Sequence, residues 1–387
     1  MLKYKKIFWR EYILNILILN DNPPPLGGAE YHIELLKSLY EKKGHKVTLF
    51  FFNDYVKGKS KKNACIELNK LLSSQKFDLA HVHAVEYYFS DCIKLLTDEY
   101  NIQTIQTLHD YRYICPTGDC FRNCEICREC HNGAFWKAGV NGCYNLIGSF
   151  NRFFNESILK KDILGIKNIF RFISPSKFLK DIFEKSCFTG KIEHIYNFLD
   201  LEKYDRCDYP RDEENPYICF TGRLMPNKGV LTLVEAVKGT KIKLRIAGKG
   251  PVADIVAKKI AEDESYKNIS LEGFLTTEDL MKLVRGASLA VVPSEWWEVL
   301  GFSAIEALAL ERPVIASKIG GLEEVVADDR GALFEPKNVV ELREKIVNLM
   351  KSPQKLDELG KNGKKFVWEN MSENIYYDKI MNVIGRV

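Results

Sequence analysis

The sequence has no uninterrupted apolar stretch near the roughly 20 residues that a membrane-spanning helix needs. It also has no internal repeat and no low-complexity tract. Its 56 basic and 52 acidic residues leave a formal charge of only +4, which is too small to indicate a nucleic-acid partner. These absences predict an ordinary globular protein that neither spans a membrane nor binds nucleic acid.

The first apolar run, Ile13–Leu19, is short and lacks a signal-peptide cleavage pattern, so it predicts a buried strand. We therefore expect the protein in the cytoplasm. Basic residues cluster at Lys3, Lys5 and Lys6 and again in Lys57–Lys62, and both clusters are typical of a solvated face. The first cluster could instead contact an anionic membrane surface, which would place the protein peripherally at the inner face of the membrane.

Short apolar runs alternate with helical patterns along most of the 387 residues, a length typical of two domains. A helix is expected from about Ala29 to Lys43, with Gly44 as its stop signal. The expected strands are Ile13–Leu19, Val47–Phe52, Leu79–His83, Thr104–Leu108 and Asn168–Ile173 in the first half, and Tyr217–Thr221, Lys243–Ala247, Ile269–Leu271, Leu289–Val292 and Val314–Ala316 in the second. This alternation predicts an α/β fold of two Rossmann-like domains, whose parallel sheets are covered on both faces and have a cleft between them.

The polar segment Leu201–Pro216 interrupts the pattern and predicts a linker. It would separate an N-terminal domain at residues 1–200 from a C-terminal domain at residues 217–372. The last helix, about Glu373–Ile384, lies in a terminal segment, residues 373–387, that we expect to pack back on the N-terminal domain.

The stretch Pro293–Ala309 (PSEWWEVLGFSAIEALA) places two acidic residues, Glu298 and Glu306, on either side of Gly301. An apolar strand ends at Pro293 and a helix is expected to begin near Gly301. The free backbone N–H groups of a helix start can hold a phosphate. Carboxylates beside a phosphate would repel it, so these two glutamates are better suited to bind hydroxyl groups. A sugar and a ribose joined through a diphosphate fit this arrangement.

A second loop, GRLMPNKG, follows the expected strand Tyr217–Thr221 and carries Arg223 and Lys228. The carboxyl end of a strand is where open parallel sheets bind ligands. Two cations at this edge could neutralise a diphosphate and stabilise it as a leaving group. The alternative is a pair of ordinary surface charges.

With these motifs in order, the chain resembles glycosyltransferase family 4, the retaining sugar transferases of the GT-B fold. The resemblance extends from Ile13 to the last helix. The matching motifs are GGAE at Gly27–Glu30, HVH at His81–His83, TLHD at Thr107–Asp110, SPSKFL at Ser174–Leu179, NFLD at Asn197–Asp200, GRLMPNKG at Gly222–Gly229, AGKGP at Ala247–Pro251, EGF at Glu272–Phe274, the E-x7-E segment at Glu298–Glu306, and IGGLEEVV at Ile319–Val326. Each motif alone is weak, and the ordered set is specific.

The resemblance implies a role for each matching residue. Arg223 and Lys228 would bind the donor diphosphate, Glu306 the ribose hydroxyls and Glu298 the hydroxyls of the transferred sugar. His109 would approach that sugar from the N-terminal, acceptor-side domain. Gly222 is a further donor-binding position, and Gly27 and Gly28 would let the first loop of the N-terminal domain approach the diphosphate closely. Phe274 and Leu275 would lie near the base. The backbone of Leu300, Gly301 and Phe302 would touch the phosphate or sugar.

His109 follows an expected strand, so it should emerge at the carboxyl edge of the first sheet. This position and the family pattern favour a functional role over a structural one. His81 and His83 are two residues apart and should share a face of their strand. His83 could contact the acceptor, and a buried histidine bonded to the backbone is the alternative.

The resemblance implies transfer of a hexose, with retention of anomeric configuration, from a UDP- or GDP-linked donor to a glycan or lipid-linked saccharide. Synthesis of a cell-surface polysaccharide or glycoconjugate would be the context. No catalytic metal is expected, because two side-chain cations neutralise the diphosphate and no obvious Asp-x-Asp ends a strand. The alternatives are a nucleotide-sugar epimerase of the same fold, a glycan phosphorylase, which would normally be longer, and a zinc-containing glycan-binding protein without catalysis.

Cysteine is abundant and unevenly distributed, because six of the eleven lie between Cys115 and Cys143. In a cytosolic chain this clustering favours a metal site or structural thiols over disulfides. Two overlapping C-x2-C pairs suit a structural zinc, with free thiols as the main alternative and an iron–sulfur cluster as a third. The candidate ligands of this Cys-rich insertion, residues 115–143, are Cys115, Cys120, Cys124, Cys127, Cys130 and Cys143, with His131 as a further candidate. Its aromatic residues Phe121, Phe135, Trp136 and Tyr144 could stack on a sugar or form a small core.

Overall fold

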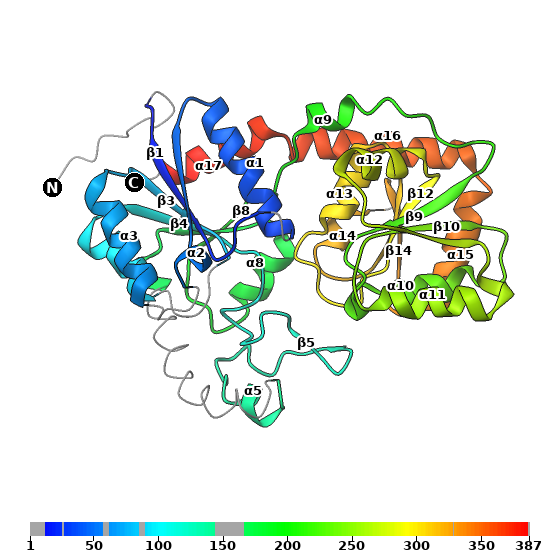
Figure 1. The fold of residues 1–387 in the computed structure, drawn as a ribbon, viewed down its shortest axis with the longest axis horizontal. Helices are drawn as coiled ribbons and strands as arrows, with labels where there is room; N and C mark the ends of the chain where they lie inside the picture. The colour runs from blue at the N-terminus through cyan, green and yellow to red at the C-terminus, as the bar shows by residue number, and fades with distance from the viewer. Residues whose placement is uncertain are drawn as a thin grey trace. The chain divides into compact units, whose positions relative to one another are not determined.

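The computed structural model describes residues 12–24, 27–56, 62–84, 90–143, 166–327 and 329–385 (Figure 1). The chain divides into two compact units. Unit 1 comprises Met1–Cys120, Cys127–Phe198 and Glu373–Val387, and unit 2 comprises Phe121–Ile126 and Leu199–Ser372. The basic cluster at Lys3–Lys6, most of the cluster Lys57–Lys62, and Tyr144 lie outside the described residues.

The core of unit 1 is a six-stranded parallel sheet in the order β2-β1-β3-β4-β7-β8. Strand β1 lies between β2 and β3, and five of its six residues are buried, as expected for a parallel sheet with both faces covered. The predicted parallel sheet is therefore confirmed, while β8 was not predicted. The strands are β1 (Asn15–Asn20), β2 (Lys46–Phe51), β3 (Leu79–Val82), β4 (Gln103–Thr107), β7 (Arg171–Ser174) and β8 (Ile192–His194).

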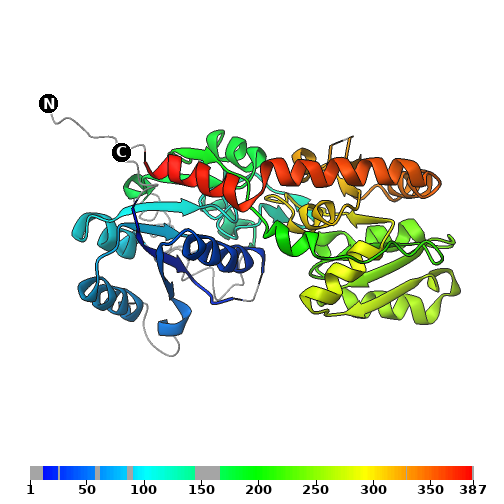
Figure 2. The same ribbon diagram turned by 90° about the horizontal axis from the view of Figure 1, so that it is seen from above.

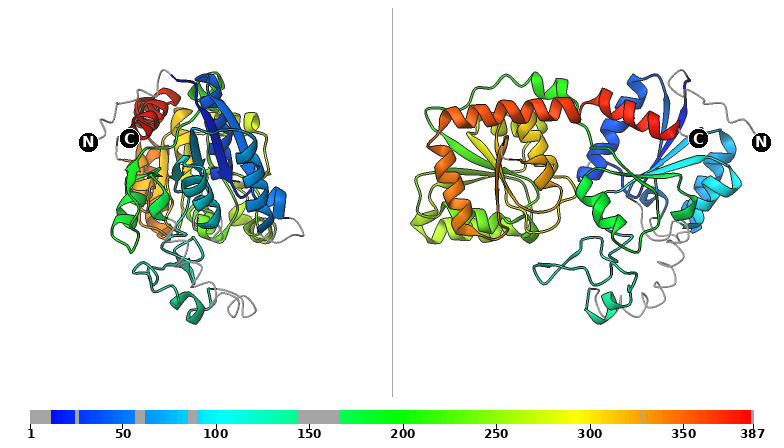
Figure 3. Two further views of the ribbon diagram at one scale, coloured as in Figure 1. Left: turned by 90° about the vertical axis from the view of Figure 1, so that its left-hand side faces the viewer. Right: turned by 180° about the vertical axis from the view of Figure 1, so that it is seen from behind.

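Helix α17, at the end of the chain, packs in the same apolar core as α1 and β1. Figures 2 and 3 show α17, in red, across the unit 1 sheet. A hydrogen bond from Gln103 Nε2 to the Ile384 carbonyl (3.0 Å) ties α17 to β4. The helices of this unit are α1 (Gly28–Lys42), α2 (Asn53–Val56), α3 (Lys62–Ser74), α4 (Ser90–Lys94), a π-helix (Leu95–Glu99), α5 (Lys137–Val140), a 3-10 turn (Ile166–Asn168), α8 (Lys177–Glu184) and α17 (Glu373–Ile384).

Unit 2 contains a second six-stranded parallel sheet, in the order β11-β10-β9-β12-β13-β14. Its strands are β9 (Tyr217–Thr221), β10 (Lys243–Ala247), β11 (Ile269–Gly273), β12 (Leu289–Val292), β13 (Val314–Ser317) and β14 (Gly331–Phe334). The adjacent strands β9 and β12 are parallel, so the loops that follow them emerge at the same edge of the sheet. Strand β14 was not predicted.

Helices cover both faces of the unit 2 sheet, with α10 and α11 on one side and α12 and α13 on the other in Figure 1. The helices are α9 (Leu201–Asp205), α10 (Val230–Val237), α11 (Val252–Glu262), α12 (Thr277–Gly286), α13 (Phe302–Ala309), α14 (Leu322–Val325), α15 (Val339–Met350) and α16 (Pro353–Asn370), with 3-10 turns at Pro226–Lys228 and Glu264–Tyr266. Within the described residues, no helix has the length and apolar character needed to cross a membrane.

The segment predicted as a linker, Leu201–Pro216, begins with a helix. Asp200 caps α9 by accepting a hydrogen bond from the Lys203 backbone N–H. Farther along the segment, Arg211 forms an ion pair with Asp357 on α16, with 2.7 Å between Nη1 and Oδ1. The ion pair of Arg211 with Asp357 therefore ties the segment to α16.

Candidate active site

The loop after β9 places two cations at the carboxyl edge of the unit 2 sheet. Gly222 follows the strand with φ of 148°, a conformation that favours glycine. Arg223 is exposed and has no ion-pair partner among the described residues. Lys228 ends a 3-10 turn, and Gly229, the next residue, is the N-cap of α10. A Cβ at Gly229 would lie 1.8 Å from the Pro293 carbonyl oxygen, so this loop needs glycine to lie against the loop after β12.

Lys228 and Glu298 form a direct ion pair, with 2.5 Å between Nζ and Oε1. Ser294 Oγ donates a hydrogen bond of 2.6 Å to the same carboxylate oxygen. The Lys228 ammonium also lies 5.0 Å from the centre of the Trp296 ring. Burial alone would raise the pKa of the Glu298 carboxyl, but the charge of Lys228 and these hydrogen bonds hold its pKa below the ordinary value. Glu298 is therefore ionised and can only accept hydrogen bonds.

The backbone of Glu298 is held by the loop after β13. Its carbonyl oxygen accepts a hydrogen bond of 2.7 Å from the Gly321 N–H. Gly320 has φ of 64°, and a Cβ there would lie 2.5 Å from the same carbonyl oxygen. The two glycines of the IGGLEEVV motif thus let the loop after β13 approach the loop after β12 closely. This contact fixes the backbone that carries the Glu298 carboxylate.

Glu306 lies on α13 and pairs with a residue outside the predicted site. The Tyr204 hydroxyl, on α9, donates a hydrogen bond of 3.0 Å to Glu306 Oε1. Burial raises the pKa of Glu306 to about 7, and the bond from Tyr204 limits the rise. Sequence reasoning placed Tyr204 in a linker. The only available signal was Asp200, which is typical of a helix N-cap.

Gly301 is the N-cap of α13 and has φ of 90°, so the helix starts where the sequence predicts. A Cβ at this position would lie 2.5 Å from a methyl carbon of Leu322. Leu300 is buried, whereas Gly301 and Phe302 are half-exposed and accessible to a ligand. Phe274 and Leu275 follow β11, where Phe274 is 73% exposed and has the Lys249 ammonium 5.2 Å from its ring centre.

In unit 1, the loop after β1 leads to α1, whose N-cap is Gly27. Gly27 has φ of −167°, an extended conformation open to any residue, so its backbone does not require glycine. A Cβ there would lie 3.2 Å from Glu30 Oε2. Gly27 and Gly28 are both exposed, and the close approach of a ligand to them stays a prediction.

His109 follows β4 and is half-exposed, as the sequence predicts. Its Nε2 lies 2.9 Å from His83 Nδ1, and the two rings stack with 5.2 Å between their centres. Burial, followed by the charge of Arg112, lowers the pKa of His109 to about 3. The imidazole is therefore neutral at ordinary pH and can act as a hydrogen-bonding group but not as a cation.

His81 and His83 stack with 4.4 Å between ring centres, which confirms that they share a face. Both are fully buried, so His83 does not reach solvent as an acceptor contact would. His81 Nε2 lies 2.8 Å from Thr107 Oγ1. His83 instead stacks on His109 and shares a hydrogen bond with it, a relationship that the sequence did not indicate.

The cysteines separate into a disulfide and nine free thiols. Cys65 and Cys92 are joined, with 5.7 Å between their Cα atoms, a pairing that the sequence did not predict. None of the six cysteines of the 115–143 insertion is joined in a disulfide. Phe135 is buried in the insertion's small core, whereas Trp136 is 51% exposed. As the side chains of the described residues stand, no three His, Cys, Asp or Glu residues have the arrangement of a metal site.

Comparison with known proteins assigns the chain to a class. The family model "Glycosyl transferases group 1" matches residues 203–366, which contain Arg223, Lys228, Glu298 and Glu306. An uncharacterized glycosyltransferase of Methanocaldococcus jannaschii is 27% identical over 382 residues, covering 92% of this chain and 95% of that protein. The chain is a GT-B glycosyltransferase of the family 4 type.

A second sequence relative and two solved structures are also similar to this glycosyltransferase. The poly(ribitol-phosphate) alpha-N-acetylglucosaminyltransferase of Staphylococcus aureus is 30% identical over 170 residues, which are 42% of this chain and 34% of that protein. Among solved structures, sucrose-phosphate synthase from Thermosynechococcus elongatus has a TM-score of 0.72 at 18% identity, covering 96% of this chain and 98% of its own. Anabaena HepE in complex with UDP has a TM-score of 0.71 at 16% identity, covering 97% of this chain and 100% of that chain. These structures confirm the predicted GT-B fold.

Proposed function

We propose that this glycosyltransferase moves a hexose from a UDP- or GDP-linked donor to a glycan or lipid-linked saccharide, with retention of anomeric configuration. One observation supports the donor assignment above all. Arg223, without an ion-pair partner among the described residues, lies in the same loop as Lys228 at the carboxyl edge of the unit 2 sheet. A diphosphate would supply the anion that this exposed guanidinium lacks.

The two glutamates would accept hydrogen bonds from hydroxyl groups of the donor. Ionised Glu298 has one oxygen, Oε1, engaged by Lys228 and Ser294, and its other oxygen, Oε2, would accept from a sugar hydroxyl. Glu306 would accept from the ribose, beside the hydroxyl of Tyr204. The fold relative whose structure contains UDP and the relative that acts on poly(ribitol-phosphate) support a nucleotide donor and a glycan acceptor.

In the proposed reaction the bond between the anomeric carbon and the phosphate oxygen breaks, and its electron pair stays on the phosphate. The acceptor hydroxyl attacks from the same face, and its proton passes to the departing phosphate oxygen. Arg223 and Lys228 would stabilise the charge that builds on this oxygen, which is the main electrostatic contribution to the rate. We propose that this reaction needs no divalent metal, since both cations come from side chains.

The experiment has two stages. First, thermal unfolding of the full chain is measured with UDP-glucose, UDP-N-acetylglucosamine and GDP-mannose, and the donor that raises the melting temperature most is chosen. Second, that donor is incubated with a panel of saccharide acceptors, and the anomeric configuration of the product is read by NMR. An α-linked product from an α-linked donor supports the proposal. A changed sugar without any acceptor would indicate an epimerase, and glycan binding without turnover would indicate a binding protein.

A further inference from the structure

The insertion at residues 115–143 has little regular structure and only a small apolar core. Its regular structure consists of the short strands β5 (Phe121–Arg122) and β6 (Glu125–Ile126) and the single turn α5. Its buried apolar cluster contains only Cys130, Phe135 and Ala138. Ordering each residue costs about 1–2 kcal/mol, which so small a core cannot offset. Small units of this kind are normally closed by disulfides or a metal ion.

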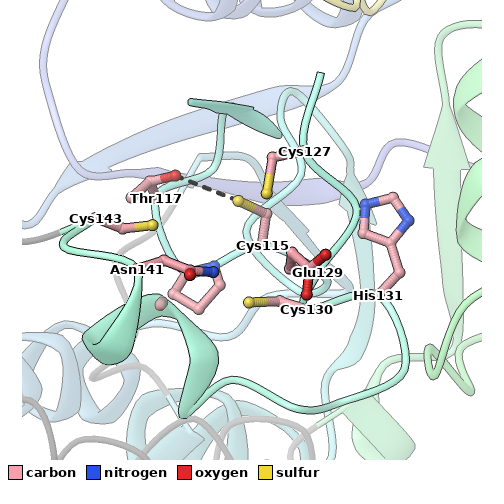
Figure 4. Close-up of a pocket in the computed structure, with 10 residues that line it drawn as sticks. Cys115, Thr117, Cys127, Glu129, Cys130, His131, Asn141 and Cys143 are labelled. Atoms are coloured by element: carbon pink, nitrogen blue, oxygen red, sulfur yellow. Dashed lines mark hydrogen bonds between the residues drawn. The ribbon is translucent and has the colours of Figure 1, made fainter. Parts of the chain in front are cut away.

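Four of the six cysteines line one small cavity within the insertion, and we call them the four-cysteine cluster. Figure 4 shows their sulfurs turned towards the space that the loop encloses. The cavity measures about 10 Å³, close to the space of a single water molecule. Cys130 interacts electrostatically with all three of the others. The members of the cluster are Cys115, Cys127, Cys130 and Cys143.

The other two cysteines of the insertion do not line this cavity. Cys124 is exposed in the turn between β5 and β6, with φ of 61°. Cys120 is buried, its thiol is hydrogen-bonded to that of Cys115, and its sulfur lies 3.4 Å from His131 Nε2. His131 lines the cavity, but its Nε2 is engaged by Cys120. Of the two overlapping C-x2-C pairs in the sequence, only Cys127 and Cys130 therefore face the cavity together.

We propose that the four-cysteine cluster is a structural zinc site. Four thiolates are the ligand set of a closed tetrahedral zinc centre, and one tight turn presents the C-x2-C pair together. Thiolates disfavour magnesium and calcium, which take oxygen ligands. As the side chains are placed, no three of these thiols have the arrangement of a metal site, so ligation requires the sulfurs to move closer together. Binding would draw the sulfurs to about 2.3 Å from the ion and contract the cavity around it.

The site would stabilise a loop that begins shortly after His109, which follows β4. The Cys115 N–H donates to the Tyr111 carbonyl at 2.7 Å, and the Tyr111 N–H donates to the Gly118 carbonyl at 3.0 Å. These bonds connect the first cluster member to the residues directly after His109. Closure of the insertion by zinc would thereby fix the chain at the carboxyl end of β4.

Metal content of the full chain tests the proposal. Protein without a histidine tag is produced in zinc-supplemented medium, and bound metals are measured by mass spectrometry. We expect about one zinc per chain in the unmodified protein and in the matched control Cys124→Ser, and little or none in Cys127→Ser or Cys130→Ser. An unmodified protein without zinc, one with iron and sulfide instead, or variants of the cluster with full zinc content would overturn the proposal.

A second measurement does not depend on the folding of the variants. The unmodified protein is treated with a chelator, and zinc release and reactive thiols are followed together. We expect four thiols per chain to become reactive as one zinc is released, and thermal stability to fall until zinc is restored. If the same four sulfurs prove to be oxidised to disulfides, or if zinc leaves without exposing thiols, the site does not exist.

Discussion

The ammonium of Lys228 lies 2.5 Å from a carboxylate oxygen of Glu298, so the two residues predicted to bind different parts of the donor bind each other. The family resemblance assigns one to the diphosphate and the other to the sugar. Their side chains come from loops after the adjacent strands β9 and β12. A cation that contacts both the sugar-binding carboxylate and the phosphate would couple recognition of the sugar to stabilisation of the leaving group.

Replacing Lys228 by alanine should lower both activity and stability. The change leaves the buried Glu298 carboxylate without its counter-ion, which we expect to cost about 3 kcal/mol of unfolding free energy. Turnover should fall by about 10²–10³. The double variant Lys228→Met with Glu298→Gln removes both charges and should recover most of the stability but none of the activity. Equal destabilisation of the single and double variants in urea unfolding would contradict a direct pair.

Glu306 should give the protein a specific pH dependence. Its carboxyl has a pKa of about 7 in the folded chain, above the ordinary value of 4.5. Between these values the folded state binds the extra proton, so this group's contribution to stability falls as pH rises from about 4.5 to 7. Glu306→Gln should remove that slope and gain about 1–3 kcal/mol at pH 8. Urea unfolding of both proteins at several pH values measures how the free energy of unfolding depends on pH. An unchanged pH dependence in the variant would refute the assignment.

His83 should position His109 rather than contact a substrate. His83 Nε2 is buried without a partner, and a buried N–H without an acceptor is rarer than an unpaired lone pair. The proton of the shared hydrogen bond therefore belongs to His83 Nδ1, which leaves His109 with its proton on Nδ1. Nitrogen NMR of the two rings reports this tautomer directly.

Activity provides a second check on His83. His83→Phe removes the donor and should lower turnover by about 10–100-fold through misplacement of His109. His83→Asn keeps an N–H donor near the same place and should retain most of it. An equal loss in both variants, or His109 found with its proton on Nε2, would rule out the positioning role.

The sequence predicts most of the fold because apolar runs and turn residues mark buried strands clearly. Strands β9, β10 and β12 and helix α17 have the predicted bounds. The strands β8 and β14, with sequences IEH and GALF, were missed because three or four residues at the edge of a sheet give too little pattern. The residue roles at the donor site stay predictions.

Side-chain partners could not be predicted in the same way. The bond between Tyr204 and Glu306 joins residues 102 positions apart, and nothing in the local sequence of Tyr204 marks it. The stacking of His83 on His109 depends on the order of strands β3 and β4 in the sheet, which periodicity does not reveal. The pairing of Cys65 with Cys92 likewise depends on how α3 and α4 pack.

The Cys65–Cys92 disulfide should contribute to stability without affecting turnover. It closes a loop with a sequence separation of 27 residues, which corresponds to about 2–4 kcal/mol. The double variant Cys65→Ser with Cys92→Ser should therefore unfold at lower urea concentration than the oxidised protein. Addition of a reductant should destabilise the unmodified protein but leave the double variant unchanged. Equal sensitivity of the two proteins to reductant would show that this bond does not contribute.

The measurement closest to the central claim is the affinity of the chain for a nucleoside diphosphate compared with the matching monophosphate. Calorimetric titrations with UDP and UMP, and with GDP and GMP, are made on the unmodified protein and on Arg223→Ala. We expect the unmodified protein to bind one diphosphate much more tightly than its monophosphate, and the variant to lose about 10-fold or more of that preference. An Arg223→Ala variant that keeps the full preference for the diphosphate would contradict the assignment of this loop.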